Sequence, residues 1–243
     1  MAIQHYDYPS AKSVVICGDI HGEFENLAYQ SCVRYKMRDT LIIVAGDCGF
    51  GFKYPAYDID FYYSRKMDRI IDANNYIAFV RGNHDNPWYF DGEHVGYERF
   101  RAVPDYSVLT VCGHQILCVG GAVSIDRDMR TKDKDWWEDE KPVFVPDRLS
   151  DLRREGYRID TVVTHTAPSF CDFTMQPKMI DDDGLLSDLR NERVTMNAIL
   201  AMLAVGDHPL RRWYYGHFHK SWNAEIDGIR YTMLGIMEMK EIR

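Results

Sequence analysis

The chain has 243 residues, and its 37 acidic residues against 29 Lys and Arg give a net charge of −8. This acidic balance argues against a basic nucleic-acid-binding protein or a polybasic membrane-surface protein. Hydrophobic residues make up 46% and charged residues 27%, the composition of a globular chain that buries a sizeable core, which excludes disordered and collagen-like proteins.

Two further sequence features bear on location. No run of about 18 uncharged apolar residues occurs, and the N-terminus has no basic region followed by an apolar stretch. The six cysteines are scattered without a C-x-x-C pair, which favours free thiols in a reducing compartment over a zinc ribbon or a disulfide framework. We therefore expect a cytoplasmic protein with no membrane partner.

The first third of the chain alternates short apolar runs with helical patterns. Ser13–Cys17, residues 41–45 and Tyr76–Val80 are apolar and bounded by Gly or Asp, as in buried parallel strands. Residues 23–36 and 57–74 between them read as helices. Strands that alternate with helices indicate right-handed βαβ units with a parallel sheet.

After residue 100 the pattern changes to hairpins and further strands. Asp227-Gly228 between two apolar runs is a strong two-residue hairpin signal, and no repeat or linker interrupts the chain, so we expect one domain over residues 1–243. Two long loops, 124–145 and 166–184, are either functional segments or solvated excursions. The remaining predicted strands are Ser107–Val111, 115–119, Thr161–Thr164, Arg212–Tyr215, Trp222–Ile226 and Ile229–Met233, and the remaining helices are 146–155 and 185–205.

Five short segments place Asp, Asn or His directly after an apolar strand. Ligands of α/β sheets bind just outside the carboxyl ends of strands, so these side chains should converge on one crevice. A neighbouring glycine lets the backbone turn sharply and approach a bound ion or phosphate. The segments are Gly18-Asp19-Ile20-His21-Gly22, Gly46-Asp47-Cys48-Gly49, Gly82-Asn83-His84-Asp85, Thr164-His165 and Gly216-His217-Phe218-His219.

The converging groups are three carboxylates, one amide and five imidazoles, and without Asp85 two carboxylates remain as candidate ligands. Imidazole and carboxylate together suit zinc, iron, manganese or nickel. Asp19 with His21, and His217 with His219, place two side chains on the same side of an extended segment and can chelate. With Asp47 shared, these donors would serve two ions about 3.5–4 Å apart, the spacing used in two-metal phosphoester hydrolysis.

In their order and spacing from residue 18 to residue 219, these five segments resemble the signature of the calcineurin-like metallophosphoesterase superfamily. The resemblance implies an α/β fold, a four-layer α/β/β/α sandwich of two mixed sheets. It implies a dinuclear metal-dependent phosphoesterase that cleaves a phosphomonoester or phosphodiester by in-line attack of a metal-bound hydroxide. The cofactors would be two divalent transition-metal ions, Mn, Fe, Zn or Ni, with manganese favoured.

The resemblance also assigns roles to matching positions. His84 would protonate the leaving-group oxygen, a task that suits an imidazole with a pKa near 6.5, and Asp85 either orients that imidazole or caps the turn. The implied metal ligands are Asp19, His21 and His219 for the first ion, Asn83, His165 and His217 for the second, and Asp47 as the bridge.

The second segment lacks the Arg that follows it in the protein Ser/Thr phosphatase branch, and Asp85 stands where that branch has Glu. The chain looks more like bacterial and phage members, and protein phosphatase activity is disfavoured. Arg127 or Arg130 can replace the missing phosphate clamp, because a guanidinium forks onto phosphate oxygens, and Asn83 also faces the substrate. Otherwise these arginines are surface residues, and Trp136-Trp137 either stacks on a substrate ring or packs in the core.

The substrate stays open at this stage. A small phosphoester is favoured, while a nuclease or cyclic-nucleotide phosphodiesterase on the same site is an alternative in which two cations reverse the local charge. A non-catalytic scaffold of the same fold is the other alternative, since fold does not fix function. The sequence leaves the oligomeric state undetermined.

Overall fold

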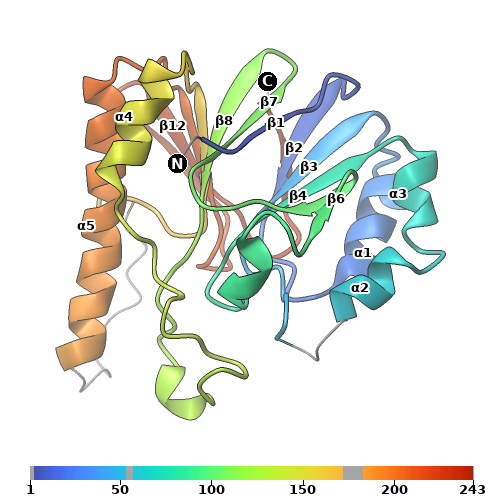
Figure 1. The fold of residues 1–243 in the computed structure, drawn as a ribbon, viewed down its shortest axis with the longest axis horizontal. Coiled ribbons are helices and arrows are strands. Elements are labelled where there is room, and N and C mark those ends of the chain that lie inside the picture. Colours follow the sequence, from blue (N-terminus) through green and yellow to red (C-terminus); the bar gives the residue numbers. More distant parts are fainter. Residues whose placement is uncertain (1–2, 53–56, 172–182, 243) are drawn as a thin grey trace.

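This computed structural model describes residues 3–52, 57–171 and 183–242. Two mixed β-sheets lie face to face, and helices cover the outer face of each sheet, so that four layers follow one another across the molecule (Figure 1). The four-layer α/β/β/α sandwich with two mixed sheets predicted from the sequence is therefore confirmed.

The six-stranded sheet carries the first three signature segments. Its central strands are parallel, and an antiparallel strand closes each edge. The central strands are continuous apolar runs because both of their faces are buried. In spatial order the strands are β13 (Met239–Glu241), β2 (Ser13–Cys17), β3 (Thr40–Ala45), β4 (Tyr76–Val80), β6 (Phe100–Ala102) and β5 (Gly96–Tyr97).

The seven-stranded sheet carries the last two signature segments. Two antiparallel pairs, β7 with β8 and β11 with β12, flank the parallel strands in its centre. In spatial order the strands are β1 (His5–Asp7), β7 (Ser107–Val111), β8 (His114–Val119), β9 (Thr161–Thr164), β10 (Arg212–Tyr215), β12 (Ile229–Met233) and β11 (Trp222–Ile226).

The helices cover the two outer faces, and some differ from their predicted bounds. The pattern over 23–36 is α1 (Phe24–Tyr29) continued by a π-helical stretch, Gln30–Arg34. The pattern over 57–74 is two helices, α2 (Tyr57–Tyr62) and α3 (Asp68–Asp72). Ser64 lies in the break, where its hydroxyl bonds the Phe61 carbonyl and accepts from the Lys66 amide, local bonds that compete with a continuous helix.

On the other outer face, α4 (Pro146–Arg154) and α5 (Asp183–Val205) follow the predicted helices closely. Single turns of 3₁₀ helix occur at Pro87–Phe90 and Arg127–Met129. The part of the chain that the structure describes holds no helix long and apolar enough to cross a membrane.

The core is divided by the sheets into three apolar clusters. Alternate residues of one strand serve different clusters: Ile16 and Ile43 pack between the sheets, whereas Cys17 and Val44 pack under α1. The third cluster lies between the seven-stranded sheet and the helices α4 and α5. Because their faces are buried, the strands are held in one register. The register sets where each strand ends relative to its neighbours.

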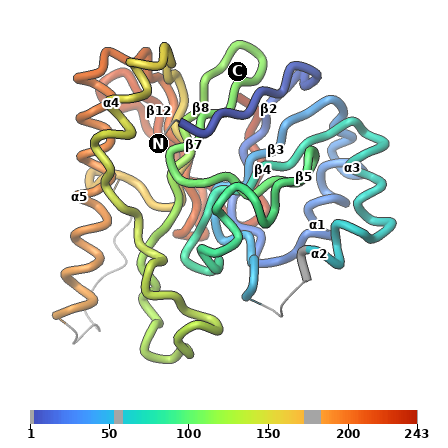
Figure 2. The backbone as a smooth tube through the Cα atoms, viewed as in Figure 1, coloured from blue at the N-terminus to red at the C-terminus, as the bar shows by residue number. Residues whose placement is uncertain are grey.

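The sequence did not indicate β1, β5, β6 and β13, which are edge strands or strands of two or three residues. The carboxyl ends of β2, β3 and β4 meet those of β9 and β10 where the two sheets adjoin. The loop 124–145 extends beyond these ends at the bottom of the view (Figure 2).

Candidate metal centre

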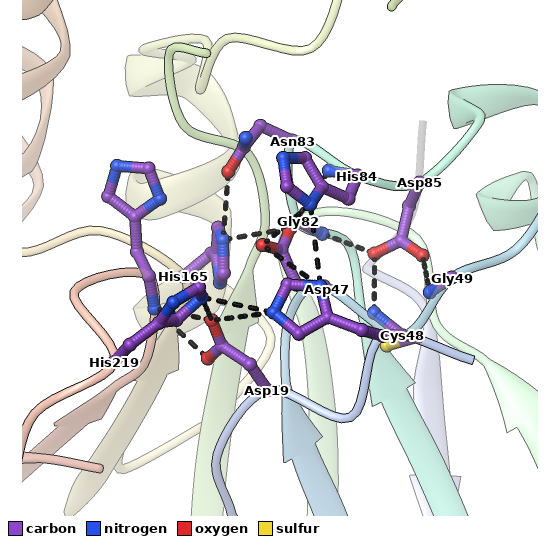
Figure 3. A network of polar contacts seen from close by, with 12 residues as sticks. Asp19, Asp47, Cys48, Gly49, Gly82, Asn83, His84, Asp85, His165 and His219 are labelled. Carbon is purple, nitrogen blue, oxygen red and sulfur yellow. Dashed lines mark hydrogen bonds and ion pairs between the residues drawn. The ribbon is translucent and has the colours of Figure 1, made fainter. Parts of the chain in front are cut away.

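The five signature segments converge at the carboxyl ends of five strands, β2, β3, β4, β9 and β10 (Figure 3). Each strand ends no more than three residues before the first predicted ligand of its segment. The position of the strand in its sheet therefore determines where that ligand lies. All seven predicted metal ligands lie in this one region: Asp19, His21, Asp47, Asn83, His165, His217 and His219.

Glycines allow the segments to approach one another. A Cβ added at Gly82 would lie 2.0 Å from the Asp47 backbone nitrogen, and one at Gly216 would lie 2.0 Å from Asp19 Oδ1. No side chain fits at such distances, so neither glycine is replaceable without moving a carboxylate.

Four of the seven predicted ligands hold a backbone conformation that L-residues rarely adopt. The φ angles are +47° at His21, +46° at Asp47, +69° at His217 and +53° at His219. Left-handed backbone at non-glycine residues costs free energy of order 1 kcal/mol each and persists where the surrounding structure enforces it, often at functional sites.

The first donor set, which we define as Asp19, His21, Asp47 and His219, places one ligand atom of each residue within 4.8 Å of all the others. Nε2 of His219 lies 3.0 Å from Asp19 Oδ2 and 3.0 Å from His21 Nε2. Both carboxylates are buried. The Asp19 carboxylate is fixed by the backbone N–H of His217, which donates to it at 3.0 Å.

The second donor set, which we define as Asp47, Asn83, His165 and His217, shares Asp47 with the first. Nε2 of His165 lies 3.0 Å from Asp47 Oδ1 and 3.0 Å from Asn83 Oδ1. Nδ1 of His165 lies 2.8 Å from the carbonyl of Ala45, which can only accept, so Nδ1 carries a proton and Nε2 faces the donor set. The His217 ring centre lies 5.0 Å from that of His165.

The electrostatics of the two sets differ. Burial lowers the pKa of His165, but the Asp47 carboxylate beside it raises that pKa to about 10 overall. Burial, followed by the charge of His165, drives the pKa of His217 well below its usual range. The hydrogen bond to Asp19 raises the pKa of His219. Although burial opposes it, His165 holds the pKa of Asp47 well below the ordinary carboxyl value.

This donor chemistry fits divalent cations. Buried carboxylates and imidazole nitrogens at about 3 Å from one another turn lone pairs toward a common point, an arrangement that a cation stabilises. Asp47 belongs to both sets.

His84 lies beside the donor sets without belonging to either. Its Nδ1 is 3.5 Å from Asp47 Oδ2, and its ring stacks on Phe52, with ring centres 5.0 Å apart and planes at 20°. Its Nε2 is 2.7 Å from Nη2 of Arg130. Burial, followed by the charge of Arg130, lowers its pKa although Asp47 opposes the shift.

Among its described contacts, Asp85 neither orients the His84 imidazole nor caps the turn that follows it, but binds the backbone of two earlier turns. Its carboxylate accepts four backbone N–H bonds, from Cys48, Gly49, Phe50 and Gly82, at 2.6–3.0 Å. Figure 3 shows those from Cys48, Gly49 and Gly82. These bonds hold the turn after β3 against the turn after β4, and none of them reaches the His84 ring. The interpretation of Asp85 as the residue that orients this imidazole is therefore not supported.

The two candidate arginines have different surroundings. Asp126 grips Arg130 through two oxygens, at 2.7 Å to Nε and 2.6 Å to Nη2, and the guanidinium lies 5.2 Å above the centre of the Phe52 ring. Arg127 instead pairs with Asp188 of α5 at 2.6 Å. Nη2 of Arg130 thus lies 2.7 Å from a predicted site residue, His84, and Arg127 is tied to the helix α5.

Sequence reasoning missed Phe52 and the role of Asp126. Neither residue belongs to a motif. Phe52 acts on His84, which is distant in the chain, and Asp126 acts on Arg130, four residues away. Trp137 is buried, as the core alternative predicted, and most of the 166–184 loop, residues 172–182, lies outside the described residues.

Comparison with solved structures agrees with the fold. Over the whole chain, the fold is similar to the crystal structure of TT1561 of Thermus thermophilus, with a TM-score of 0.51 and 11% identity over 96% of this chain and 99% of that one. Lower similarity exists to the phosphopantetheinyl hydrolase from Mycobacterium tuberculosis, with a TM-score of 0.44 and 14% identity over 92% and 90% of the chains. GAP50, the anchor in the inner membrane complex of Plasmodium, has a TM-score of 0.45 and 14% identity over 92% and 71%.

None of the curated proteins matches the chain. The family model for calcineurin-like phosphoesterases matches residues 12–221, which include all five signature segments. This family is typically dependent on divalent metals, and the Asp and His cluster of the first donor set can bind one. The chain belongs to the calcineurin-like phosphoesterase family.

Proposed function

We propose that the chain is a phosphoesterase with two divalent cations that hydrolyses a phosphomonoester or phosphodiester of a small molecule. The observation that carries the proposal is the convergence of the four donors of the first set with His165 and Asn83 around Asp47, beside which the His217 ring packs on His165. Family membership supports a hydrolase in general. When bound, such cations make water a nucleophile near neutral pH and offset the charge on phosphate oxygens.

Arg130 is the residue that grips the substrate phosphate in this proposal. Its guanidinium is held in place by Asp126 and by the face of Phe52, so little conformational entropy remains to be lost on binding. A guanidinium fixed in this way is suited to forked recognition of phosphate oxygens.

His84 is the proton donor to the leaving oxygen. Because an arginine can only donate, the Nε2 atom that faces Arg130 accepts in the present arrangement, and the proton resides on Nδ1 toward Asp47. A phosphate that takes over the Arg130 hydrogen bond leaves Nε2 free to be protonated. Substrate binding and the supply of the proton donor are thereby linked through one guanidinium.

A small substrate is favoured over nucleic acid by the surroundings of His84. Phe52 and Arg130 cover the ring and leave 18% of its side chain exposed, whereas a polynucleotide needs an open basic groove. The net charge of −8 also opposes sequence-independent binding to a phosphate backbone.

Hydrolysis of p-nitrophenyl phosphate and bis-p-nitrophenyl phosphate, with Mn²⁺, Zn²⁺, Fe²⁺ or Ni²⁺ added separately, tests this function. Substitution His84→Ala should lower kcat by about 100-fold, the usual contribution of a general acid, while the metal content stays unchanged. Loss of the metals in that variant, or activity that survives complete metal removal, would contradict the proposal.

Two arginine variants form a matched pair. Arg130→Ala should raise KM and lower kcat/KM by about 10- to 100-fold, which corresponds to about 1.4–2.7 kcal/mol. Arg127→Ala removes the same group three residues away and breaks the contact to α5, so its kcat/KM should stay within about twofold of the original. Equal effects of the two substitutions would refute the clamp role of Arg130.

A further inference from the structure

A buried chain of hydrogen bonds runs from the second donor set to a residue outside every signature segment. Nδ2 of Asn83 lies 3.0 Å from Ser124 Oγ, and Ser124 Oγ lies 2.6 Å from Glu140 Oε2. The other Glu140 oxygen accepts from the Ser124 backbone N–H at 2.7 Å. All three residues are buried, at 3%, 1% and 2% exposure, so solvent does not compete for these bonds.

The polarity of this chain is determined by the number of protons that each group carries. The Ser124 hydroxyl has one proton, which it donates to the Glu140 carboxylate. Its lone pair therefore accepts from the Asn83 amide nitrogen. The Asn83 oxygen is then turned to the opposite side, where it lies 3.0 Å from His165 Nε2 and belongs to the second donor set.

The orientation of this amide matters because its two ends differ in chemistry and hardly differ in shape. Only the oxygen can bind a cation, since the NH₂ group has no available lone pair. An Asn without a fixed partner would present either end to the metal. Removal of a residue that hydrogen-bonds to a metal ligand, without touching the metal itself, typically changes metal affinity or activity by about 10- to 100-fold.

We infer that Glu140, acting through Ser124, is a positioning residue that turns the Asn83 oxygen toward the second metal ion. The inference rests on the proposed function, because it presupposes the two donor sets as a metal centre. The backbone of Glu140 is itself fixed, since the buried Arg81 donates to its carbonyl at 2.7 Å. Glu140 is therefore attached to the segment that follows β4, which also carries Asn83.

The rival interpretation is that Glu140 only closes the base of the long loop between residues 124 and 140. That loop carries Asp126 and Arg130, so its loosening would affect substrate binding. The two interpretations predict different measurements: loss of orientation weakens an ion, whereas loss of closure raises KM and leaves ion binding unchanged.

Substitution Glu140→Gln separates them. Gln keeps the shape and one oxygen for the Ser124 N–H, so the loop stays closed, but its NH₂ faces the Ser124 hydroxyl and donates to it. The hydroxyl proton is thereby released toward Asn83, which favours the flipped amide. Calorimetric titration of the full chain with Mn²⁺ should show that the affinity of one of the two sites is weakened by about 10- to 100-fold. Ser124→Ala removes the relay and should weaken the same site.

Glu192→Gln is the matched control. Glu192 of α5 is as buried as Glu140. It accepts from the backbone N–H of Val123, the residue before Ser124, at 2.8 Å. The Asn83 amide bonds to Ser124. This variant should bind two Mn²⁺ ions with unchanged affinity. Circular dichroism and thermal unfolding establish that all variants are folded.

The outcomes are distinct. Unchanged Mn²⁺ binding by Glu140→Gln, or equal weakening in Glu140→Gln and Glu192→Gln, would overturn the positioning role while leaving the proposed function intact. If the original chain binds none of Mn²⁺, Zn²⁺, Fe²⁺ and Ni²⁺, both proposals fail; if it binds another of these ions but not Mn²⁺, the same titrations are made with that ion. If it binds two ions and hydrolyses no phosphoester, only the proposed function fails, and the comparison of the two Gln variants still decides the inference.

Discussion

The two donor sets share Asp47 but differ in burial. In the first set the side chains of His21 and His219 are 28% and 43% exposed, whereas in the second set His165 is fully buried and Asn83 is 3% exposed. The imidazoles of the first set, His21 and His219, therefore lie at the mouth of the site, and His165 and Asn83 lie at its floor. The difference shows that the side chains of one site can have two roles. Those at the floor also contribute to the core, whereas those at the mouth remain accessible to solvent and to exchanging ions.

The hydrogen-bond partners follow the same division. His165 is held on both ring nitrogens, by the Ala45 carbonyl and by the Asp47 carboxylate. His219 meets the buried Asp19 carboxylate and the partly exposed His21 ring among its described contacts. An ion at the floor should consequently exchange more slowly than an ion at the mouth.

The largest effect is expected from Asp47→Asn, which removes the feature common to both sets. An amide cannot bridge two cations as a carboxylate does, so both ions should weaken and kcat/KM should fall by about 1,000-fold, equivalent to about 4 kcal/mol. Elemental analysis together with the phosphoester assay checks this. Loss of only one ion would show that the two sets do not depend on a shared ligand.

A pair of histidine substitutions tests the division directly. His165→Ala leaves the Asp47 carboxylate buried beside a new cavity and should lower the free energy of unfolding by about 3 kcal/mol. His219→Ala removes a half-exposed ring and should cost less than about 1 kcal/mol. Urea unfolding of chelator-treated samples measures both, and a similar cost for the two would show that the floor is no more structural than the mouth.

A further effect concerns pH. Because the folded-state pKa of His165 is raised from 6.5 to about 10 by Asp47, this ring carries a proton near neutral pH that an incoming cation must displace. Ion binding at the floor should therefore release about one proton and tighten by up to about tenfold per unit between about pH 7 and about pH 9. Calorimetry in buffers of different ionisation enthalpy measures the protons released.

The same shift has an opposite consequence for stability without ions. A raised His pKa stabilises the folded state fully below the unfolded value of 6.5, and this stabilisation is lost as the pH rises toward about 10. Chelator-treated protein should therefore melt at lower temperature at high pH, while the Mn²⁺ affinity increases. A pH-independent Mn²⁺ affinity would contradict the assignment of His165 as a ligand.

Much of the fold was visible in the sequence because the central strands are short apolar runs with polar ends, and β2, β4, β7 and β9 have the predicted bounds. The short edge strands were not visible, since two or three residues carry no periodicity. The break between α2 and α3 was also missed, because the side-chain bonds of Ser64 are not apparent from a helical pattern. The single domain and the cytoplasmic location stay predictions.

The candidate site divides in the same way. Each predicted ligand closely follows a strand, so its place was determined by the chain itself: mainly two residue types, carboxylate and imidazole, near glycine at the end of apolar runs. The contact of Arg130 with His84, the bonds of Asp85 to two turns, and the partnership of Ser124 with Glu140 became apparent only in the tertiary structure. These contacts join residues whose spacing in sequence has no relation to their spacing in the fold, because they depend on how loops close over the ends of two packed sheets.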